Sequence, residues 1–564
     1  MRLVYVALGW FKTLFTIILF TICTLVISQV SFAQGFDASG LQGAAPTNPT
    51  SLQFGPDGRL YVSQQNGTLY AYTIERTVGS DGKGVYSVVD TETINIVKVI
   101  QNHDDDGDIN TTQIRQITGL HATGTAENPV LYVSSSDWRI GGGDGGGDAN
   151  LDTNSGILSK VSWVGNGISD PNGFWDRIDL IRGLPRCEEN HSTNGMQIDS
   201  NSNIMYLASG GNTNAGAPSN NFAFSTEYAL SAAILSVDLN ALEQMPVRTD
   251  PRSGAKYVFD LPTVDDPTRQ NIDNTHPDFP YDASHPQYNE TIDLGDPFGG
   301  NDGLNQAKLL PGSPVQIFSP GWRNAYDVLL TENGNMYTWD NGANTGWGGL
   351  PNNEGTNNVN NNWIAGEPGA TGSNPLNGKS VDNKDGLHKI SLGYYGGHPT
   401  PIRANPNDAG LYTHDHGSGG NNGTIGGYFR TTVDETNPNI SLPVDWPPVD
   451  PSLANPIEGT FVYPEDGPGH LYSITAKSIN GLAEYTASNF NGAMKGDLLA
   501  ANFKDQTIIR VKFNSDGTAA EQVFTTFASG LGNQPLDVTA QGDNDIFPGT
   551  VWIAEYGAKG IEVL

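Results

Sequence analysis

The side chain best suited to acid–base chemistry is His191, in the segment Asn190-His191-Ser-Thr-Asn-Gly-Met196. An imidazole exchanges its proton near neutral pH, so a histidine can take the proton of a substrate hydroxyl. The residues that follow alternate like a β-strand, which places His191 at the start of a strand. A histidine at a strand end is often only a hydrogen-bonded structural residue, and the sequence leaves both roles open.

Two Asp-rich loops offer oxygen ligands for a hard cation such as Ca²⁺. Their carboxylates are Asp104, Asp106 and Asp108 in the first loop and Asp144, Asp148 and Asp152 in the second. The first loop lacks the later Gly and Glu of an EF-hand, and the second is a single copy where a calcium β-roll needs several. The sequence predicts structural calcium at each loop or, alternatively, a solvated turn.

Other catalytic sets are absent or weak. The sequence contains no G-x-S-x-G and no H-E-x-x-H motif, so neither a serine hydrolase of that type nor a zincin is indicated. The pair His414-Asp415-His416 lacks a third metal ligand, and nothing near Cys187 marks an activated thiol.

Composition narrows the class of protein. The chain has 564 residues and a formal net charge of −32, with 29 basic against 61 acidic residues. A charge this negative argues against nucleic-acid binding, which needs basic surfaces. The 69 Gly, 21 Tyr, 21 Phe and 10 Trp are typical of β-structure with many turns.

The first 33 residues have the features of a signal peptide. Basic residues precede an apolar stretch at 14–27, and Ser31-Phe32-Ala33 presents small residues at the positions that a signal peptidase reads. We expect cleavage after Ala33 and a secreted, cell-surface or periplasmic protein with no membrane span after signal removal. A retained membrane anchor is the alternative.

One strand–turn–strand pattern recurs six times, and each copy ends in a strand that resembles L-Y-V. The copies lie at 51–64, 117–135, 194–210, 324–340, 485–502 and 535–555. Alternating apolar residues around Gly-bearing turns predict antiparallel hairpins. Third strands are expected near 68–75, 156–164, 232–239, 386–392, 507–514 and 560–564, and fourth strands near 86–93, 176–183, 256–262 and 521–527.

Four strands in each of six units predict an all-β, six-bladed β-propeller over residues 34–564. Long insertions near 263–314 and 345–470, rich in Asn, Gly and Pro, explain the irregular spacing of the repeat. Two β-sandwich domains are the alternative. The last blade has three strands, so either the stretch 34–48 supplies a fourth or the natural chain is longer.

Four segments resemble the soluble quinoprotein glucose/sorbosone dehydrogenases, which are six-bladed propellers. The segment Asn190–Met196 resembles the part of that family that carries its catalytic histidine. Further similarity lies in Pro320-Gly-Trp-Arg323-Asn324-Ala-Tyr with the loop 340–344, in Gly393-Tyr-Tyr-Gly-Gly-His-Pro399, and in residues 495–511.

The resemblance implies oxidation of a sugar or related alcohol with pyrroloquinoline quinone (PQQ), Ca²⁺ and an external electron acceptor. It makes His191 the general base and places Arg323, Asn324 and Lys504 on the quinone, where cations pair with carboxylates and carbonyls. The backbone carbonyls of Gly342 and Ala343 would bind calcium. His398 and Arg403 could line the substrate mouth, unless the Pro-rich loop that carries them is simply rigid.

This sequence departs from the family at several positions. The acidic residue that often precedes the histidine is Asn190, and the Gly-Asp after the next strand is Gly211-Asn212. Where the glucose enzymes bring arginines to the quinone, this chain has Asn533-Gln534-Pro535-Leu536-Asp537. A non-catalytic propeller that binds glycans or a cell-surface partner is therefore the alternative function, and a calcium-dependent hydrolase is a third.

Overall fold

The computed structural model describes most of the chain from residue 35 onward. The described ranges are 35–104, 109–143, 147–217, 219–223, 225–250, 253–264, 303, 305–351, 384–407, 445–475 and 477–564, together with four short strands inside the gaps. The expected signal peptide, Asp106, Asp108, Asp144 and the His414-Asp415-His416 pair lie outside the described residues.

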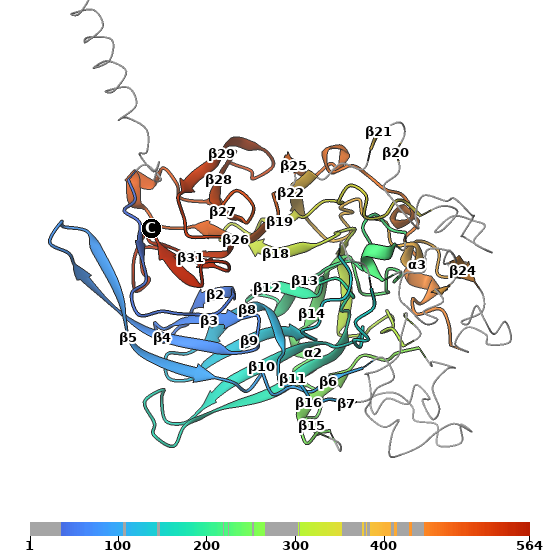
Figure 1. Ribbon diagram of the computed structural model, residues 1–564, viewed down its shortest axis with the longest axis horizontal. Coiled ribbons are helices and arrows are strands. Elements are labelled where there is room, and N and C mark those ends of the chain that lie inside the picture. The colour runs from blue at the N-terminus through green and yellow to red at the C-terminus, as the bar shows by residue number, and fades with distance from the viewer. Residues whose placement is uncertain are drawn as a thin grey trace, which may run out of the picture.

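Six sheets each contain a four-stranded antiparallel blade (Figure 1). From the innermost strand outward, the blades are β2 (Pro49–Phe54), β3 (Leu60–Gln64), β4 (Leu69–Val78) and β5 (Gly84–Ile94); β8 (Gln116–Gly124), β9 (Pro129–Ser136), β10 (Gly156–Val164) and β11 (Phe174–Leu184); β12 (Thr193–Asp199), β13 (Ile204–Ser209), β14 (Ala233–Asp238) and β17 (Val315–Pro320); β18 (Ala325–Leu330), β19 (Met336–Asp340), β22 (Lys384–Ile390) and β25 (His470–Thr475); β26 (Ile479–Tyr485), β27 (Asp497–Asn502), β28 (Thr507–Phe513) and β29 (Ala520–Ser529); and β30 (Pro535–Ala540), β31 (Val551–Glu555), β32 (Gly560–Val563) and β1 (Ser39–Gly40).

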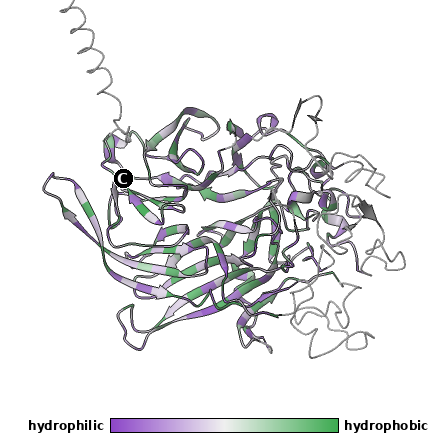
Figure 2. Ribbon diagram, in the orientation of Figure 1, coloured by the Kyte–Doolittle hydropathy of each residue, from purple (hydrophilic) through white to green (hydrophobic). Residues whose placement is uncertain are grey.

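The innermost strands form a closed ring. β2, β8, β12, β18, β26 and β30 contact one another in that order, and β30 contacts β2. Figure 2 shows hydrophobic and hydrophilic residues mixed along the strands, and the apolar ones of neighbouring blades pack together in shared clusters. The predicted six-bladed β-propeller is confirmed.

The last blade is completed by the N-terminal segment. β1 pairs antiparallel with β32, with Ser39 opposite Val563 and Gly40 opposite Glu562. The ring of Phe36 packs near those of Tyr485, Phe490 and Phe527. Of the two interpretations of the short last blade, the strand supplied by residues 34–48 is the one observed.

Two predicted strands are placed differently. The segment expected as an outer strand at 256–262 contains β16 (Lys256–Asp260), which extends the second blade by pairing in parallel with β11, while β17 completes the third. β15 (Arg248–Thr249) adds an edge strand. In the fifth blade, Tyr485 is the last residue of the innermost strand β26, whereas the sequence predicted it as the first residue of the hairpin at 485–502.

The remaining elements are short. They are β6 (Asn102–His103), β7 (Ile109–Asn110), β20 (Pro375–Leu376), β21 (Lys379–Ser380), β23 (Leu411–Thr413), β24 (Tyr428–Arg430), α2 (Leu239–Glu243), α3 (Pro401–Ala404), η1 (Asn220–Phe222), η3 (Pro451–Leu453), η4 (Pro456–Gly459), η5 (Pro464–Asp466) and η6 (Asn489–Gly492). Among the described residues, no helix is both long and apolar enough to cross a membrane.

Candidate functional site

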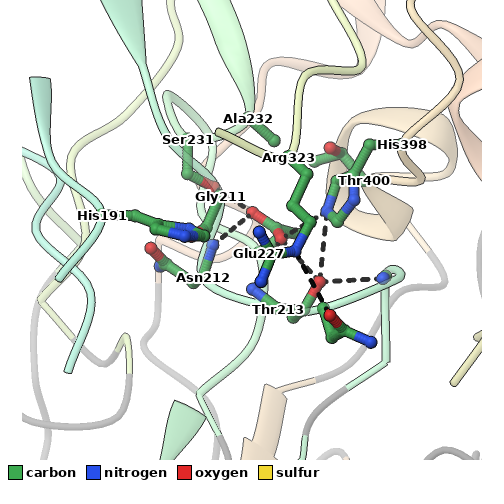
Figure 3. A network of polar contacts seen from close by, with 12 residues as sticks. His191, Gly211, Asn212, Thr213, Glu227, Ser231, Ala232, Arg323, His398 and Thr400 are labelled. Carbon is green, nitrogen blue, oxygen red and sulfur yellow. Dashed lines mark hydrogen bonds and ion pairs between the residues drawn. The ribbon is translucent and has the colours of Figure 1, made fainter. Parts of the chain in front are cut away.

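Loops of the third and fourth blades bring His191, Arg323 and His398, three of the predicted site residues, together with Glu227. His191 lies directly before β12, and Glu227 lies in the connection between β13 and β14. Arg323 lies between β17 and β18, and His398 follows β22. Figure 3 shows these side chains converging on one polar network.

His191 is buried and held in one orientation. Its Nδ1 lies 2.8 Å from the carbonyl oxygen of Gly211, and its Nε2 lies 3.4 Å from Oε2 of Glu189. The ring of Phe222 meets the imidazole edge to face. Burial, with a further contribution from Arg323, lowers the pKa of His191 well below its usual value. The imidazole is therefore neutral at neutral pH, the state that a base requires.

Glu227 is the centre of the network. Its carboxylate accepts hydrogen bonds from the backbone N–H groups of Asn212 and Thr213, from the hydroxyls of Thr213 and Ser231, and pairs with Nε2 of His398 at 2.8 Å. Burial alone would raise the pKa of Glu227, but His398 and the hydroxyls outweigh it and lower the pKa to about 2.

Arg323 is buried and makes two side-chain hydrogen bonds within the protein. Its Nε donates to Oδ1 of Asn214 at 3.2 Å, and Nη1 donates to the carbonyl oxygen of Asn341 at 3.4 Å. The guanidinium lies 5.7 Å from the centre of the Phe222 ring. Asp340 accepts the backbone N–H groups of both Arg323 and Asn324, and burial raises the pKa of Asp340 to about 6.

A cavity of about 230 Å³ adjoins this network at the mouth of the central channel. It is lined by six side-chain amides, five hydroxyl groups and two apolar residues: Gln65, Gln116, Asn190, Asn194, Asn324, Asn480, Thr50, Thr118, Ser478, Tyr326, Tyr556, Phe503 and Leu536. None of these lining residues carries a charged side chain. Thr118 and Tyr326 also line a second cavity of about 140 Å³ between the innermost strands.

The cavity does not present the cations that a tricarboxylate quinone needs. Of the three residues expected on PQQ, Asn324 lines the cavity, whereas Arg323 and Lys504 do not. Lys504 is exposed, and the charge of Arg323 is directed to Asn214 and Asn341. Amides and hydroxyls instead suit a neutral, polyhydroxylated ligand, whose hydroxyl groups both donate and accept hydrogen bonds.

The residues expected at the substrate mouth lie inside the protein. Arg403 pairs with Oε2 of Glu458 at 2.7 Å and donates to the carbonyl oxygen of Ser231 at 2.6 Å. His398 pairs with Glu227, and neither residue lines the described cavities. Both side chains connect the loop after β22 to the segment between β13 and β14. Their contacts are those expected of residues that hold a rigid loop in place.

The expected calcium ligands lie in two places, because the two Asp-rich loops are neighbours: Asp104 forms a β-bridge with Leu151, and the N–H of Asp152 donates to the carbonyl oxygen of His103. The backbone N–H of Gly342 donates to Asp385, and Ala343 packs against Ala215. Asp104 forms an ion pair with Arg139. Asp148 and Asp152 accept backbone N–H groups two residues further along the chain. Among the described residues, these carboxylates do not form a group of three that could surround a metal ion.

Sequence reasoning missed three residues that the structure places beside His191. Glu189 and Cys187 have ligand atoms that lie, with that of His191, within 4.8 Å of one another. Glu227 is distant in the sequence, and no local pattern marks it. Glu189 could have been found from the sequence. The resembled family often has an acidic residue directly before its histidine, and this chain has one two residues before His191.

Comparisons with known proteins returned similarities only among solved structures. No family model and no curated protein matches the chain. A PQQ-bound aldose sugar dehydrogenase from Streptomyces coelicolor is 12% identical, with 93% of this chain and 97% of that chain covered and a TM-score of 0.41. A Trichoderma reesei protein of carbohydrate-active enzyme family AA12 is 12% identical. The match covers 95% of this chain and 98% of that chain, with a TM-score of 0.44. The apo form of a soluble aldose sugar dehydrogenase from Escherichia coli is 11% identical, with 93% and 98% covered and a TM-score of 0.42.

Proposed function

We propose that this propeller is a dehydrogenase that oxidises a sugar or related alcohol bound in the amide-lined cavity. One observation carries the proposal: Asn190 and Asn194, which flank the buried His191 in the chain, both line an uncharged polar cavity, and burial lowers the pKa of His191 so that its imidazole is unprotonated. The motifs around His191 and Arg323, which resemble the quinoprotein sugar dehydrogenases, point to the same chemistry.

His191 would take the proton of the reacting hydroxyl group. The carbonyl of Gly211 accepts from Nδ1–H, so Nε2 carries the lone pair that can bind the proton. Phe222 covers one side of the ring, and Glu189, whose side chain is 13% exposed, lies at Nε2. The substrate C–H leaves as hydride to an external two-electron acceptor while its O–H proton passes to Nε2, and the product is a carbonyl.

PQQ with calcium is the acceptor that the sequence resemblance implies, and we keep it as the first cofactor to test. The lining of the cavity offers Asn324 but no cation for the carboxylates of PQQ, so these residues do not fit PQQ. When bound, PQQ supplies an electrophilic quinone that accepts a hydride, and a calcium ion would polarise its carbonyl.

The decisive experiment is a titration of the full chain with PQQ and Ca²⁺, followed by absorbance and by reduction of an artificial dye with a panel of aldoses and alcohols. We expect dye reduction that depends on both sugar and acceptor. If no sugar reduces the dye with PQQ or with quinone acceptors lacking carboxylates, the dehydrogenase proposal fails.

A second candidate is a glycan-binding propeller without catalysis, favoured by the uncharged lining and by the phenyl ring over His191. Phe503 and Tyr556, with ring centres 6.0 Å apart, offer apolar faces for a sugar ring. Calorimetry with neutral oligosaccharides separates the two functions. Binding that persists in His191→Ala, together with no turnover in the native chain, would favour the glycan binder.

We also propose export through residues 1–33. The motive is the apolar stretch followed by Ser31-Phe32-Ala33, and export would place the protein at the cell surface, in the periplasm or outside the cell. Expression in a secreting host and N-terminal sequencing test this. A mature chain that begins at Gln34 is expected, whereas an unprocessed membrane-bound chain would support the retained anchor.

A further inference from the structure

We propose that Cys187, Glu189 and His191 form a binding site for a thiophilic divalent cation of the Zn²⁺ class. Their thiol, carboxylate and imidazole ligand atoms all lie within 4.8 Å of one another. The three residues come from a single turn before β12, so the donors are placed by local structure. Nothing in the quinoprotein resemblance implies such a site.

Backbone hydrogen bonds close this turn and orient the donors. The N–H of Cys187 donates to the carbonyl oxygen of His191 at 3.0 Å, and the N–H of His191 donates to Sγ of Cys187 at 3.1 Å. Arg186 braces the turn from outside by donating to the carbonyl oxygens of Asp137 and Arg139. The sulfur and the imidazole are thereby held on the same side of the turn.

The closest pair of donor atoms has the spacing that a metal ion imposes. Because Gly211 accepts from Nδ1–H, Nε2 of His191 presents a lone pair, and it faces Oε2 of Glu189 at 3.4 Å. Two lone pairs that face each other repel unless a proton or a cation lies between them. Tetrahedral bonds of about 2.0–2.2 Å to nitrogen and oxygen place those ligands about 3.4 Å apart.

A second observation comes from Asn212. This residue is 1% exposed, and among the described residues nothing hydrogen-bonds to either end of its side-chain amide. Figure 3 shows this amide beside His191. A buried amide without partners costs free energy, which a fourth ligand contact through Oδ1, or a metal-bound water, would recover.

The donor set favours one class of metal. One sulfur, one nitrogen and one oxygen suit Zn²⁺ or Co²⁺, whereas Ca²⁺ prefers oxygen ligands only. Glu189 provides the entry path, because its side chain is partly exposed while Cys187 and His191 are buried. The positive charges of nearby Arg186 and Arg323 oppose a cation, and burial raises the pKa of the Cys187 thiol to about 12. A bound metal must therefore displace the thiol proton, after which the thiolate and the carboxylate offset the two arginines.

This site shares one atom with the proposed function and has a consequence for it. Nε2 of His191 can hold either a proton or a metal ion, so a bound metal would block the base. Zn²⁺ should therefore inhibit sugar oxidation, and a chelator should restore it. Metal binding is measurable without any turnover, so failure of the dehydrogenase proposal would leave the metal site testable.

The test is titration of the full chain, reduced with a phosphine, with Co²⁺ and Zn²⁺. We expect a thiolate-to-cobalt charge-transfer band and calorimetric Zn²⁺ binding that weakens at least about 10-fold in Cys187→Ser and Glu189→Gln. Glu188→Gln is the matched control, because Glu188 is the adjacent acid outside the donor set. Circular dichroism checks the fold of each variant.

Two outcomes would overturn the site. One is the absence of a thiolate charge-transfer band in the native chain. The other is equal Zn²⁺ affinity in the native chain and in both variants, which would mean that a proton on Glu189, and not a metal ion, bridges to His191.

Discussion

At the scale of single residues, the site is built from buried charges that are fully compensated. Glu227 accepts four hydrogen bonds and also pairs with His398, and Arg403 pairs with Glu458. A buried charge is tolerable only with such partners. These residues position the loops around His191, whereas His191 itself makes one hydrogen bond through its ring and leaves Nε2 for chemistry.

Glu227→Gln should destabilise the fold strongly. The change removes the charge opposite His398 and forces an amide N–H₂ toward donors, so we expect a loss of about 3–5 kcal/mol in the free energy of unfolding. Urea unfolding at pH 7 measures it. Because the pKa of Glu227 is lowered from 4.5 to about 2, the native chain should lose this stability as the pH falls from about 4.5 to 2, and the variant should not. An equal acid sensitivity in both chains would contradict this role.

His191→Ala should remove turnover without removing sugar binding. Loss of a general base typically costs about 10²–10⁴-fold in rate, whereas the amides that line the cavity remain in place. Steady-state dye reduction and calorimetry give the two readouts. His121→Gln is the matched control, because His121 is a half-buried histidine whose pKa is also lowered by burial but which lies on β8, outside the network. Similar losses in both variants would indicate a structural effect.

At the scale of elements, two aspartates join innermost strands of different blades. Asp537 on β30 accepts from the hydroxyl of Ser51 and from the backbone N–H of Leu52 on β2, and Asp327 on β18 accepts from the N–H of Leu482 on β26. Both carboxylates line the cavity of about 140 Å³ between the innermost strands. Burial, together with the neighbouring Asp537, raises the pKa of Asp327 well above its usual value.

This pair predicts a dependence of stability on pH. Burial raises the pKa of Asp537 from 3.8 to about 6, so the folded state holds a proton that the unfolded state has released. Stability from this group is therefore complete below about pH 4 and falls as the pH rises toward 6. We expect a higher melting temperature at pH 5 than at pH 7 and a smaller difference in Asp537→Asn. The exposed Asp516→Asn is the control, and an unchanged pH difference in Asp537→Asn would refute the assignment.

The elements could be predicted where the signal is local. Alternation and turn residues fix most hairpins, because the first and second strands of a blade are neighbours in the sequence. The partner of β16 could not be predicted, since its pairing with β11 depends on the buried ion pairs of Arg182 with Asp250 and Asp260. The outer strands β17 and β25 follow long insertions and carry no periodic signal.

The site was predictable to a similar extent. His191, Arg323 and Asn324 follow recognisable motifs and do come together, whereas the uncharged cavity is assembled from all six innermost strands or their adjoining loops. No single segment of sequence records that lining. His398 and Arg403 were expected to line the substrate mouth or to lie in a rigid loop, and their buried ion pairs give them a positioning role that spacing could not reveal.

At the scale of the whole molecule, the ring is closed by two segments from opposite ends of the described chain. β1 hydrogen-bonds to β32, and the backbone N–H of Leu41 donates to the carbonyl oxygen of Ile561. This pairing covers the outer edge of β32 and gives the sixth blade its fourth strand. The propeller therefore depends on a very short strand.

Deletion of residues 35–40 should open the ring. The change removes β1 and the ring of Phe36 from the apolar cluster around Tyr485, so we expect a fall in melting temperature of at least about 5 °C and faster proteolysis of the last blade. Phe36→Leu is the matched control, because it keeps the strand and most of the apolar contact. A deletion variant as stable as the native chain would show that closure does not need β1.

The amide-lined cavity has no charged lining residue, but it lies in a strongly acidic protein, and this affects how ligand binding responds to ionic strength. A protein of net charge −32 repels anions over a Debye length of about 10 Å at 0.1 M salt, and that repulsion fades as salt is added. A polyanionic ligand would therefore bind this chain more tightly in concentrated salt, whereas a sugar would bind equally at every concentration. The salt dependence of affinity alone thus reveals whether the occupant of the channel mouth is charged.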